Sequence, residues 1–505
     1  MKRAAGYEAL VDRYRLDVIP NWHRSFVWSE KQVHKIEKEA DGTITETFPA
    51  KQFPGEGTGE QLEFALKYDG VNLTILAQIF EALDREEFLA YLRSKPTGKY
   101  ARRLWYLYEY LTGKRLPLKD LKQGNYVDLL EPDRYVVVDR PDSVKRQRVR
   151  DNLPGVPHFC PIVRKSETVR KLYSEDLAER CRKVIEKYSE KLLSRALSYL
   201  YTKETKSSFA IEREEPGSTR TERYVRLLEE AEKEDFCAKE KLVELQNRIV
   251  DPRFADDDYR QNQNYVGESV LPGREKVHYI SPRPEDLPGL MEGLLAAHRR
   301  MKERGVHPVV HAAVIAYGFV FLHPFEDGNG RIHRFLIHNI LALDGFTPKG
   351  IMFPVSAAML DDVRAYDTSL ELFSKPLVEK IDYTLDEEGT MNVYGDTAVW
   401  YRCIDMTPQV EALYRFVLKT IEKELPRELA YLEGYDRAKA ALREIVDMPD
   451  RKIDLFIRFV LQNGGRISQS KRKSHFAFLS EEEVTRMQKA VAEAFDAVKE
   501  SNGEV

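Results

Sequence analysis

The sequence predicts a mainly α-helical protein, and three observations lead to this fold class. Apolar residues recur with helical spacing over most of the chain. The periodic segments end at glycine or proline, the residues that typically end helices. Runs of β-type residues are few and short. We therefore expect a helical core with a small β-hairpin, flanked by N-terminal and C-terminal helical regions.

The first half of the chain is expected to be helical around an irregular stretch. Helices are predicted from Gln61 to Thr112, with Gly113 as a stop, and from about Glu175 to Tyr201. Between them, residues 118–165 carry several prolines and one β-branched run, which indicates a short strand in irregular surroundings. A highly charged helix should follow from Thr221 to about Val250.

The second half adds a hairpin and three helices. Two short β-type runs flank Pro272-Gly273, a pattern typical of a hairpin. Helices are expected at 287–304, at 309–322, and from near Arg331 to a stop at Gly345.

Length, composition and charge limit the class of protein. A chain of 505 residues exceeds one ordinary core, so several domains are expected. With 42% hydrophobic and 32% charged residues, the chain is predicted to be soluble and globular. The formal net charge of −4 gives no general attraction to nucleic acid or anionic lipid.

Apolar runs and cysteines predict a cytoplasmic protein that does not enter a membrane. The longest apolar run, Val309 to Leu322, has 14 residues, fewer than the roughly 20 that span a bilayer. The first residues contain no unbroken apolar stretch, so no signal peptide is expected. The four cysteines lie far apart without a CxxC pair, which argues against a disulfide framework or a zinc site: Cys160, Cys181, Cys237 and Cys403.

The stretch HPFEDGNGRIHR, which starts at His323, concentrates groups suited to phosphate chemistry. Pro324 and the glycines must end the preceding helix, so His323 should lie at its C-terminal edge. The Gly328–Gly330 segment lets backbone amides turn inward together, and the helix beginning near Arg331 adds its own N–H groups. This combination forms a cradle for anions.

The charged residues of this stretch complete the predicted site. Arg331 and Arg334 share one helix face and can both reach a polyphosphate. Asp327 is a hard oxygen ligand suited to Mg²⁺, and His323 is a natural proton acceptor for a hydroxyl. The loop offers no nucleophile, so the substrate would supply it. The alternative is an ordinary turn between core helices with surface arginines and a capping histidine.

The same stretch resembles the signature of Fic-domain proteins, His-x-Phe-x-Asp/Glu-Gly-Asn-Gly-Arg-x-x-Arg. The sequence matches every specified position, so a chance match is negligible. The matching residues are His323, Phe325, Asp327, Gly328, Asn329, Gly330, Arg331 and Arg334.

The resemblance implies a helical protein adenylyltransferase, which moves AMP from ATP to a Ser, Thr or Tyr hydroxyl of a target protein. His323 would then be the general base, Asp327 would hold Mg²⁺, and Phe325 would anchor the loop. Nucleotide binding would fall to Gly328, Asn329 and Gly330 at the phosphates, Arg331 at the α- and β-phosphates, and Arg334 at the γ-phosphate.

A second stretch, SSFAIER, resembles the inhibitory motif of some Fic proteins, Ser/Thr-x-x-x-Glu-Gly/Asn. Ser208 and Glu212 take the defining places, and the sequence departs at Arg213, where Gly or Asn is usual. The resemblance implies that Glu212 pairs with Arg334 and excludes the γ-phosphate, and that it could also orient water for removal of AMP. Alternatively, Ser208 is a helix cap and Glu212 a surface acid.

Further segments carry interpretations that the sequence leaves open. The hairpin near residue 272 is similar to the flap with which Fic proteins clamp a target segment by strand addition. Tyr366 could stack on adenine or lie in the core. His307 and His311 are four apart, but without a third ligand nearby they are interpreted as structural.

The basic run at residues 471–473 indicates either a solvated loop or a nucleic-acid-binding module of winged-helix type. If such a module binds DNA, the chain could be an ATP-binding regulatory sensor rather than a transferase. Homo-oligomerisation, by which family members bury the inhibitory helix, also stays open. The predicted organisation is an N-terminal region of unknown role (1–165), the inhibitory helix (166–220), a Fic catalytic core (221–385) and a C-terminal helical region (386–505).

Overall fold

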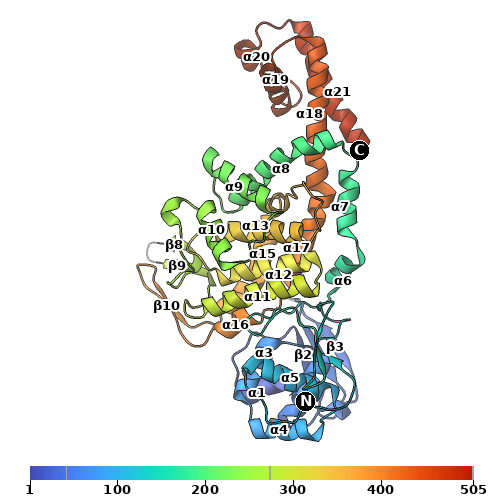
Figure 1. The fold of residues 1–505 in the computed structure, drawn as a ribbon, viewed down its shortest axis with the longest axis vertical. Coiled ribbons are helices and arrows are strands. Elements are labelled where there is room, and N and C mark those ends of the chain that lie inside the picture. The colour runs from blue at the N-terminus through green and yellow to red at the C-terminus, as the bar shows by residue number, and fades with distance from the viewer. Residues whose placement is uncertain (41, 272–273, 503–505) are drawn as a thin grey trace. The chain divides into compact units, whose positions relative to one another are not determined.

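The computed structural model in Figure 1 describes all residues except 41, 272–273 and 503–505. The protein is mainly α-helical, which confirms the predicted fold class. The described helices include none that is both apolar enough and long enough to cross a bilayer. The chain forms two compact units, which are described separately: unit 1 is Met1–Glu175, Glu222–Phe346 and Asp362–Arg415, and unit 2 is Asp176–Thr221, Thr347–Asp361 and Phe416–Val505.

Unit 1 begins with a four-stranded sheet that the sequence did not reveal. Its strand order is β1-β2-β4-β3, in which β2 and β4 are parallel and the outer pairs are antiparallel. Phe48 and Phe64 pack edge to face in the small core between this sheet and the first helices. The elements are β1 (Lys2–Ala5), α1 (Tyr7–Tyr14), β2 (His23–Trp28), β3 (Lys35–Lys38), β4 (Ile44–Phe48) and the 3₁₀ helix η1 (Ala50–Gln52).

Four helices follow where helical periodicity was predicted. They are α2 (Thr58–Tyr68), α3 (Leu73–Ala82), α4 (Arg85–Ser94) and α5 (Lys99–Thr112). Gly113 ends α5 with a φ of 69°, a left-handed conformation that glycine adopts without strain, so its role as a stop is confirmed. The irregular stretch after it holds a three-stranded sheet, β5 (Val127–Asp128), β7 (Val149–Asp151) and β6 (Asp142–Val144), and leads to α6 (Glu167–Ser174).

The centre of unit 1 is the packed group α11 (Leu287–Arg304), α12 (Pro308–Leu322) and α13 (Asn329–Leu343) (Figure 1). Every residue from Val309 to Leu322 is buried, as expected for a core helix that is apolar on all sides. The remaining elements of unit 1 are α10 (Lys239–Ile249), the 3₁₀ helix η2 (Pro252–Phe254), α15 (Val363–Val378), β10 (Tyr383–Leu385), β11 (Met391–Val393) and α16 (Ala398–Arg402).

The predicted hairpin is present as β8 (Tyr265–Leu271) and β9 (Arg274–Ile280), paired antiparallel from Tyr265 and Ile280 at its root. The pairing shifts register between Val266 and Gly267. The predicted turn at Pro272-Gly273 lies outside the described residues. Strand β9 packs against α15, so the hairpin starts from the helical core.

Two helix predictions are wrong in their bounds. The helix expected from Glu175 to Tyr201 is two helices, α7 (Leu177–Ile185) and α8 (Glu190–Ile211). Ser189 is the N-cap of α8, and its side chain accepts a hydrogen bond from the Leu192 amide. No glycine or proline ends α8 before Ile211. The helix expected from Thr221 to Val250 is likewise α9 (Ser218–Glu230) and α10, separated by a loop.

Among the described residues of unit 2, the regular elements are all helices. They include α7, α8, α14 (Val355–Leu360), the π-helix η3 (Thr420–Glu424), α18 (Leu425–Ile445), α19 (Asp450–Gln462), α20 (Gln469–His475) and α21 (Glu481–Asn502). The boundary between the units falls within α9 and within α17 (Thr407–Lys419). A winged helix requires a β-wing, and no strand occurs between Thr407 and Asn502. The basic run instead lies on α20.

Candidate active site

His323 ends α12 in a left-handed backbone conformation with a φ of 49°, which is strained for a side chain of this size. Its ring Nδ1 lies 3.2 Å from the carbonyl oxygen of Val320. Because a carbonyl only accepts hydrogen bonds, Nδ1 must carry the proton, and the lone pair of the neutral ring is then on Nε2. His323 is therefore set up to accept a proton at Nε2.

The surroundings of His323 keep its ring neutral. Burial lowers the pKa of His323 to about 4, and the positive charge of Arg260 acts in the same direction. His323 is only partly buried, so a substrate can reach its ring from solvent. A base with so low a pKa is unprotonated throughout the neutral range.

Arg260, which sequence reasoning missed, holds the backbone around His323. Its guanidinium donates to three carbonyl oxygens, those of Asn262 (2.8 Å), Pro282 (2.6 Å) and His323 (2.8 Å). The backbone amide of Arg260 also donates to the Pro324 oxygen at 2.8 Å. The side chain is only 3% exposed, and burial lowers the pKa of Arg260 to about 10. An arginine in a polar stretch gives no sequence signal for such a clamp.

The motif loop is closed by Asn329. Its side chain accepts a hydrogen bond from the Phe325 amide at 3.1 Å and donates to the Phe325 oxygen at 2.7 Å. These two bonds use one donor and one acceptor of the amide, and the predicted contact of Asn329 with phosphate stays a prediction. Phe325 is fully buried between Tyr259 and Phe319, where it anchors the loop as expected.

Gly328 begins α13 with a φ of 90°, which favours glycine. A Cβ there would lie 2.9 Å from a methyl carbon of Val250, so a larger residue would also push on α10. The amides of Asn329 and Gly330 open the helix and have no carbonyl partner within it, as the predicted anion cradle requires.

Asp327 lies at the edge of this cradle, with its side chain 45% exposed. Its Oδ1 accepts hydrogen bonds from the Gly328 amide (2.6 Å) and from Arg331 Nη2 (2.7 Å). Two more carboxylates are close by. Burial raises the pKa of both Asp256 and Glu326, and negative neighbours, Asp327 among them for Asp256, raise it further.

Arg331 and Arg334 are among the largest fully buried side chains of the protein. Burying a guanidinium is costly unless an anion neutralises it, and the carboxylate of Asp327 is such a partner for Arg331. The Nη1 of Arg334 lies 3.4 Å from the hydroxyl of Tyr366, which is 4% exposed on α15. Tyr366 thus lies beside the second motif arginine, largely buried.

The hairpin is fixed to the motif loop at its root. Asn264 donates to the Phe325 oxygen at 3.2 Å, and the Tyr279 hydroxyl donates to the Phe321 oxygen at the end of α12. The rings of Tyr279 and His323 have centroids 6.4 Å apart. A segment that pairs with the hairpin would therefore pass near the histidine.

Ser208 and Glu212 lie at the end of α8 in unit 2, where Ser208 is fully buried. Arg213 has a φ of 59°, and its amide and that of Glu214 donate back to Ala210 and Phe209. This is the hydrogen-bond pattern of a Schellman motif, whose left-handed position glycine usually fills. Arg213 takes the same conformation despite its side chain. The predicted pairing of Glu212 with Arg334 joins residues of different units and stays a prediction.

The site thus combines a neutral histidine with backbone amides and buried arginines, groups that can accept a proton and bind an anion. Residues 236–341 match the model of the Fic/DOC family. This part of the chain is therefore a Fic domain, as the motif predicted.

Two relatives match this chain over less than a quarter of its length. A protein adenylyltransferase Fic from Culex quinquefasciatus is 37% identical over 122 residues, which are 23% of this chain and 22% of the relative. The protein of the same name from Aedes aegypti is 34% identical over 119 residues, with the same coverage of 23% and 22%. The chain thus spans about a fifth of the length of these relatives.

One solved structure, of a Fic family protein from Desulfovibrio desulfuricans, matches this chain with 18% sequence identity and a TM-score of 0.36. The match covers 65% of this chain and 88% of the chain in that structure. At that score the similarity supports no conclusion.

Proposed function

We propose that the protein is an adenylyltransferase that transfers AMP from ATP to a Ser, Thr or Tyr hydroxyl of another protein. The observation that carries this proposal is the geometry of His323, whose Nδ1 faces a carbonyl so that Nε2 offers a lone pair beside the anion cradle. A protein that only binds ATP has no need of such a base. The names of the relatives support the same activity.

The reaction uses the residues already described. The target hydroxyl oxygen attacks the α-phosphorus, and a new P–O bond forms while the bond from that phosphorus to the bridging oxygen breaks. His323 Nε2 accepts the hydroxyl proton, and pyrophosphate leaves with the bond's electron pair. The amides at the start of α13 and the guanidiniums of Arg331 and Arg334 bind the phosphates and stabilise the charge that develops on them.

Asp327 fits the role of magnesium ligand. It offers hard carboxylate oxygens at the cradle's edge, and the neighbouring Asp256 and Glu326 make the local field favourable to a cation. When bound there, Mg²⁺ supplies positive charge against the phosphate oxygens. The chain's own contribution is the placement of Asp327 by Gly328 and Arg331.

We infer that Glu212 regulates this activity by pairing with Arg334. A carboxylate and a γ-phosphate compete for the same bidentate donor, so the pair would hold ATP in an unproductive position. The Schellman turn at Arg213 supports this role because it fixes the helix end that carries Glu212. With AMP already on a target, the same carboxylate could orient water for its removal.

The test is incubation of the full chain with a target lysate, Mg²⁺ and ATP labelled at the α-phosphate. Wild type would be compared with Glu212→Gly, with Glu212→Gly plus His323→Ala, and with Glu215→Gly as the control at an exposed acid three residues on. We expect strong labelling only with Glu212→Gly, because that variant has an intact base and no inhibitor. If no variant transfers label while all bind ATP, the protein is a sensor and not a transferase.

A further inference from the structure

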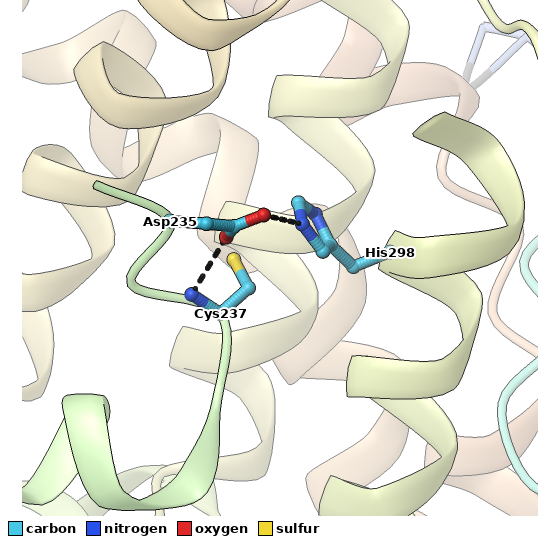
Figure 2. Close-up of side chains that lie close together, drawn as sticks. All are labelled: Asp235, Cys237 and His298. Atoms are coloured by element: carbon cyan, nitrogen blue, oxygen red, sulfur yellow. Dashed lines mark hydrogen bonds and ion pairs between the residues drawn. The ribbon is translucent and has the colours of Figure 1, made fainter. Parts of the chain in front are cut away.

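The loop between α9 and α10 places two potential metal ligands against α11. Figure 2 shows Asp235 and Cys237 from the loop and His298 from the helix, with their side chains close together. One ligand atom from each lies within 4.8 Å of the others. Sequence spacing gave no signal for this group, because His298 follows Asp235 by 63 positions.

Carboxylate oxygen, thiolate sulfur and imidazole nitrogen are the ligand types that bind zinc. Two nitrogen or oxygen ligands about 2.1 Å from a tetrahedral ion lie about 3.4 Å apart. His298 Nε2 lies 3.1 Å from Asp235 Oδ2, close to that separation. We propose that Asp235, Cys237 and His298 form a binding site for a divalent ion of zinc type, separate from the Asp327 site.

The hydrogen bonds behind His298 favour a cation at its Nε2. His298 Nδ1 lies 3.0 Å from His311 Nε2, and His311 Nδ1 lies 2.7 Å from Asp344 Oδ2. Carboxylates only accept hydrogen bonds, so without a metal the outer nitrogens, His298 Nε2 and His311 Nδ1, must both carry protons. The two inner nitrogens, His298 Nδ1 and His311 Nε2, then face each other at 3.0 Å, and one of them must donate to the other.

A metal ion at His298 Nε2 is compatible with this chain of rings. His298 then carries its proton on Nδ1 and donates to His311 Nε2, and His311 donates to Asp344. Every ring nitrogen then has a partner. This is the arrangement usual behind metal-bound histidines, whose second nitrogen donates towards a carboxylate and fixes the ring.

The loop that carries Asp235 and Cys237 is held in place by the motif helix. Asn339 of α13 donates to the oxygens of Ala231 and Glu234, both at 2.7 Å, and accepts from the Phe236 amide at 3.2 Å. Asn339 is fully buried. The ligands therefore sit on a loop of defined shape, and an ion would fasten this loop and the motif helix to α11.

Lys302 is the group that a metal must displace. Its Nζ lies 2.7 Å from the same Asp235 Oδ2, and the two side chains are 42% and 36% exposed. The ammonium can swing into solvent, which leaves a route from solvent to the site and a fourth coordination position for water. Cys237 is buried, and burial raises the pKa of its thiol, so metal binding would release its proton.

The first experiment measures Zn²⁺ retained by the full chain after dialysis against a weak chelator, and the spectrum of the Co²⁺-loaded protein. We expect about one ion per chain and a thiolate-to-cobalt charge-transfer band. Cys237→Ser should lose the band and weaken binding by about 10-fold or more, by analogy with the loss of supporting groups at metal sites. Cys403→Ser, at another buried cysteine outside the group, should bind as wild type does.

A second variant keeps the test valid if Cys237→Ser fails to fold. Lys302→Met removes the competing ammonium and leaves all three ligands, so it should bind Zn²⁺ more tightly than wild type. Retention of no metal by either wild type or Lys302→Met would overturn the proposal. An unchanged Co²⁺ spectrum in folded Cys237→Ser would also overturn it.

Discussion

Two places in unit 1 hold histidines with opposite surroundings. At the motif loop, His323 turns one nitrogen to an uncharged carbonyl. At the other place, His298 and His311 turn their outer nitrogens to the carboxylates of Asp235 and Asp344. The difference teaches that the partner of one ring nitrogen decides what the other can do. A neutral carbonyl at one nitrogen leaves the other nitrogen as a proton acceptor. Carboxylates beside the rings favour a cation there.

Removing the proposed base, His323, is the strongest test of this comparison between the two histidine sites. His323→Asn keeps a residue that tolerates the left-handed backbone but has no basic nitrogen. In the Glu212→Gly background we expect AMP transfer to fall about 10² to 10⁴-fold, the usual contribution of a general base. ATP binding, measured by calorimetry, should persist.

His34→Asn, just before β3, is the matched control, because His34 is an exposed histidine that contacts Glu46. It should leave transfer unchanged. A transfer rate for His323→Asn equal to that of the control would mean that the lone pair at Nε2 is not used.

The histidine pair should matter for stability rather than for transfer. His311→Leu removes the ring that bonds to the Asp344 carboxylate and to His298 Nδ1, and we expect a loss of about 2 to 4 kcal/mol in the free energy of unfolding. Hydrogen exchange of the α11 and α12 amides measures this loss as a smaller opening free energy.

Tyr317→Phe on the same helix is the control, because it removes a single neutral hydrogen bond, the one to Ser369. Its cost should be about 1 kcal/mol. Equal losses in the two variants would show that the carboxylates do not depend on the rings.

The pH dependence of transfer sharpens the comparison further. A histidine base with an ordinary pKa of about 6.5 would lose roughly 30-fold of its neutral form at pH 5. With the pKa of His323 lowered to about 4, little should be lost at that pH. Single-turnover transfer measured between pH 8 and pH 5 should therefore stay nearly flat, and a break near 6.5 would contradict the assignment.

The same shift has a consequence for stability, and its sign is defined. Between pH 6.5 and about 4 the unfolded chain binds a proton at this position that the folded chain does not. Folding stability should therefore be fully present above pH 6.5 and decrease as the pH falls towards 4. His333, whose pKa burial lowers to about 3, acts in the same direction.

The smallest expected effect concerns backbone strain alone, without the chemistry of a histidine ring. Arg213 shares the left-handed conformation of His323 but has no part in the proposed proton transfer. Arg213→Gly should stabilise the end of α8 by about 1 kcal/mol, because glycine adopts this conformation without steric cost. Slower hydrogen exchange at the Glu214 amide would report it. Faster exchange would mean that the arginine side chain contributes more than its strain costs.

Sequence reasoning found the local features and missed those made by distant residues. The motif loop and α11 to α13 were predicted because their signals, glycine, proline and apolar periodicity, are local. The clamp by Arg260 and the group around Cys237 depend on residues brought together only by folding. The breaks after α7 and α9 were missed because neither contains glycine or proline, and tertiary contacts such as those of Asn339 fix the second one.

The guanidinium of Arg260 donates to main-chain oxygens of the motif loop and of the hairpin root. Hydrogen bonds to main-chain oxygens do not depend on which side chains those residues carry. Residues at the root of the hairpin, such as Asn262 and Pro282, can therefore be exchanged while the position of His323 is preserved. The motif loop can therefore keep its hydrogen bonds to Arg260 while the side chains at the hairpin root vary.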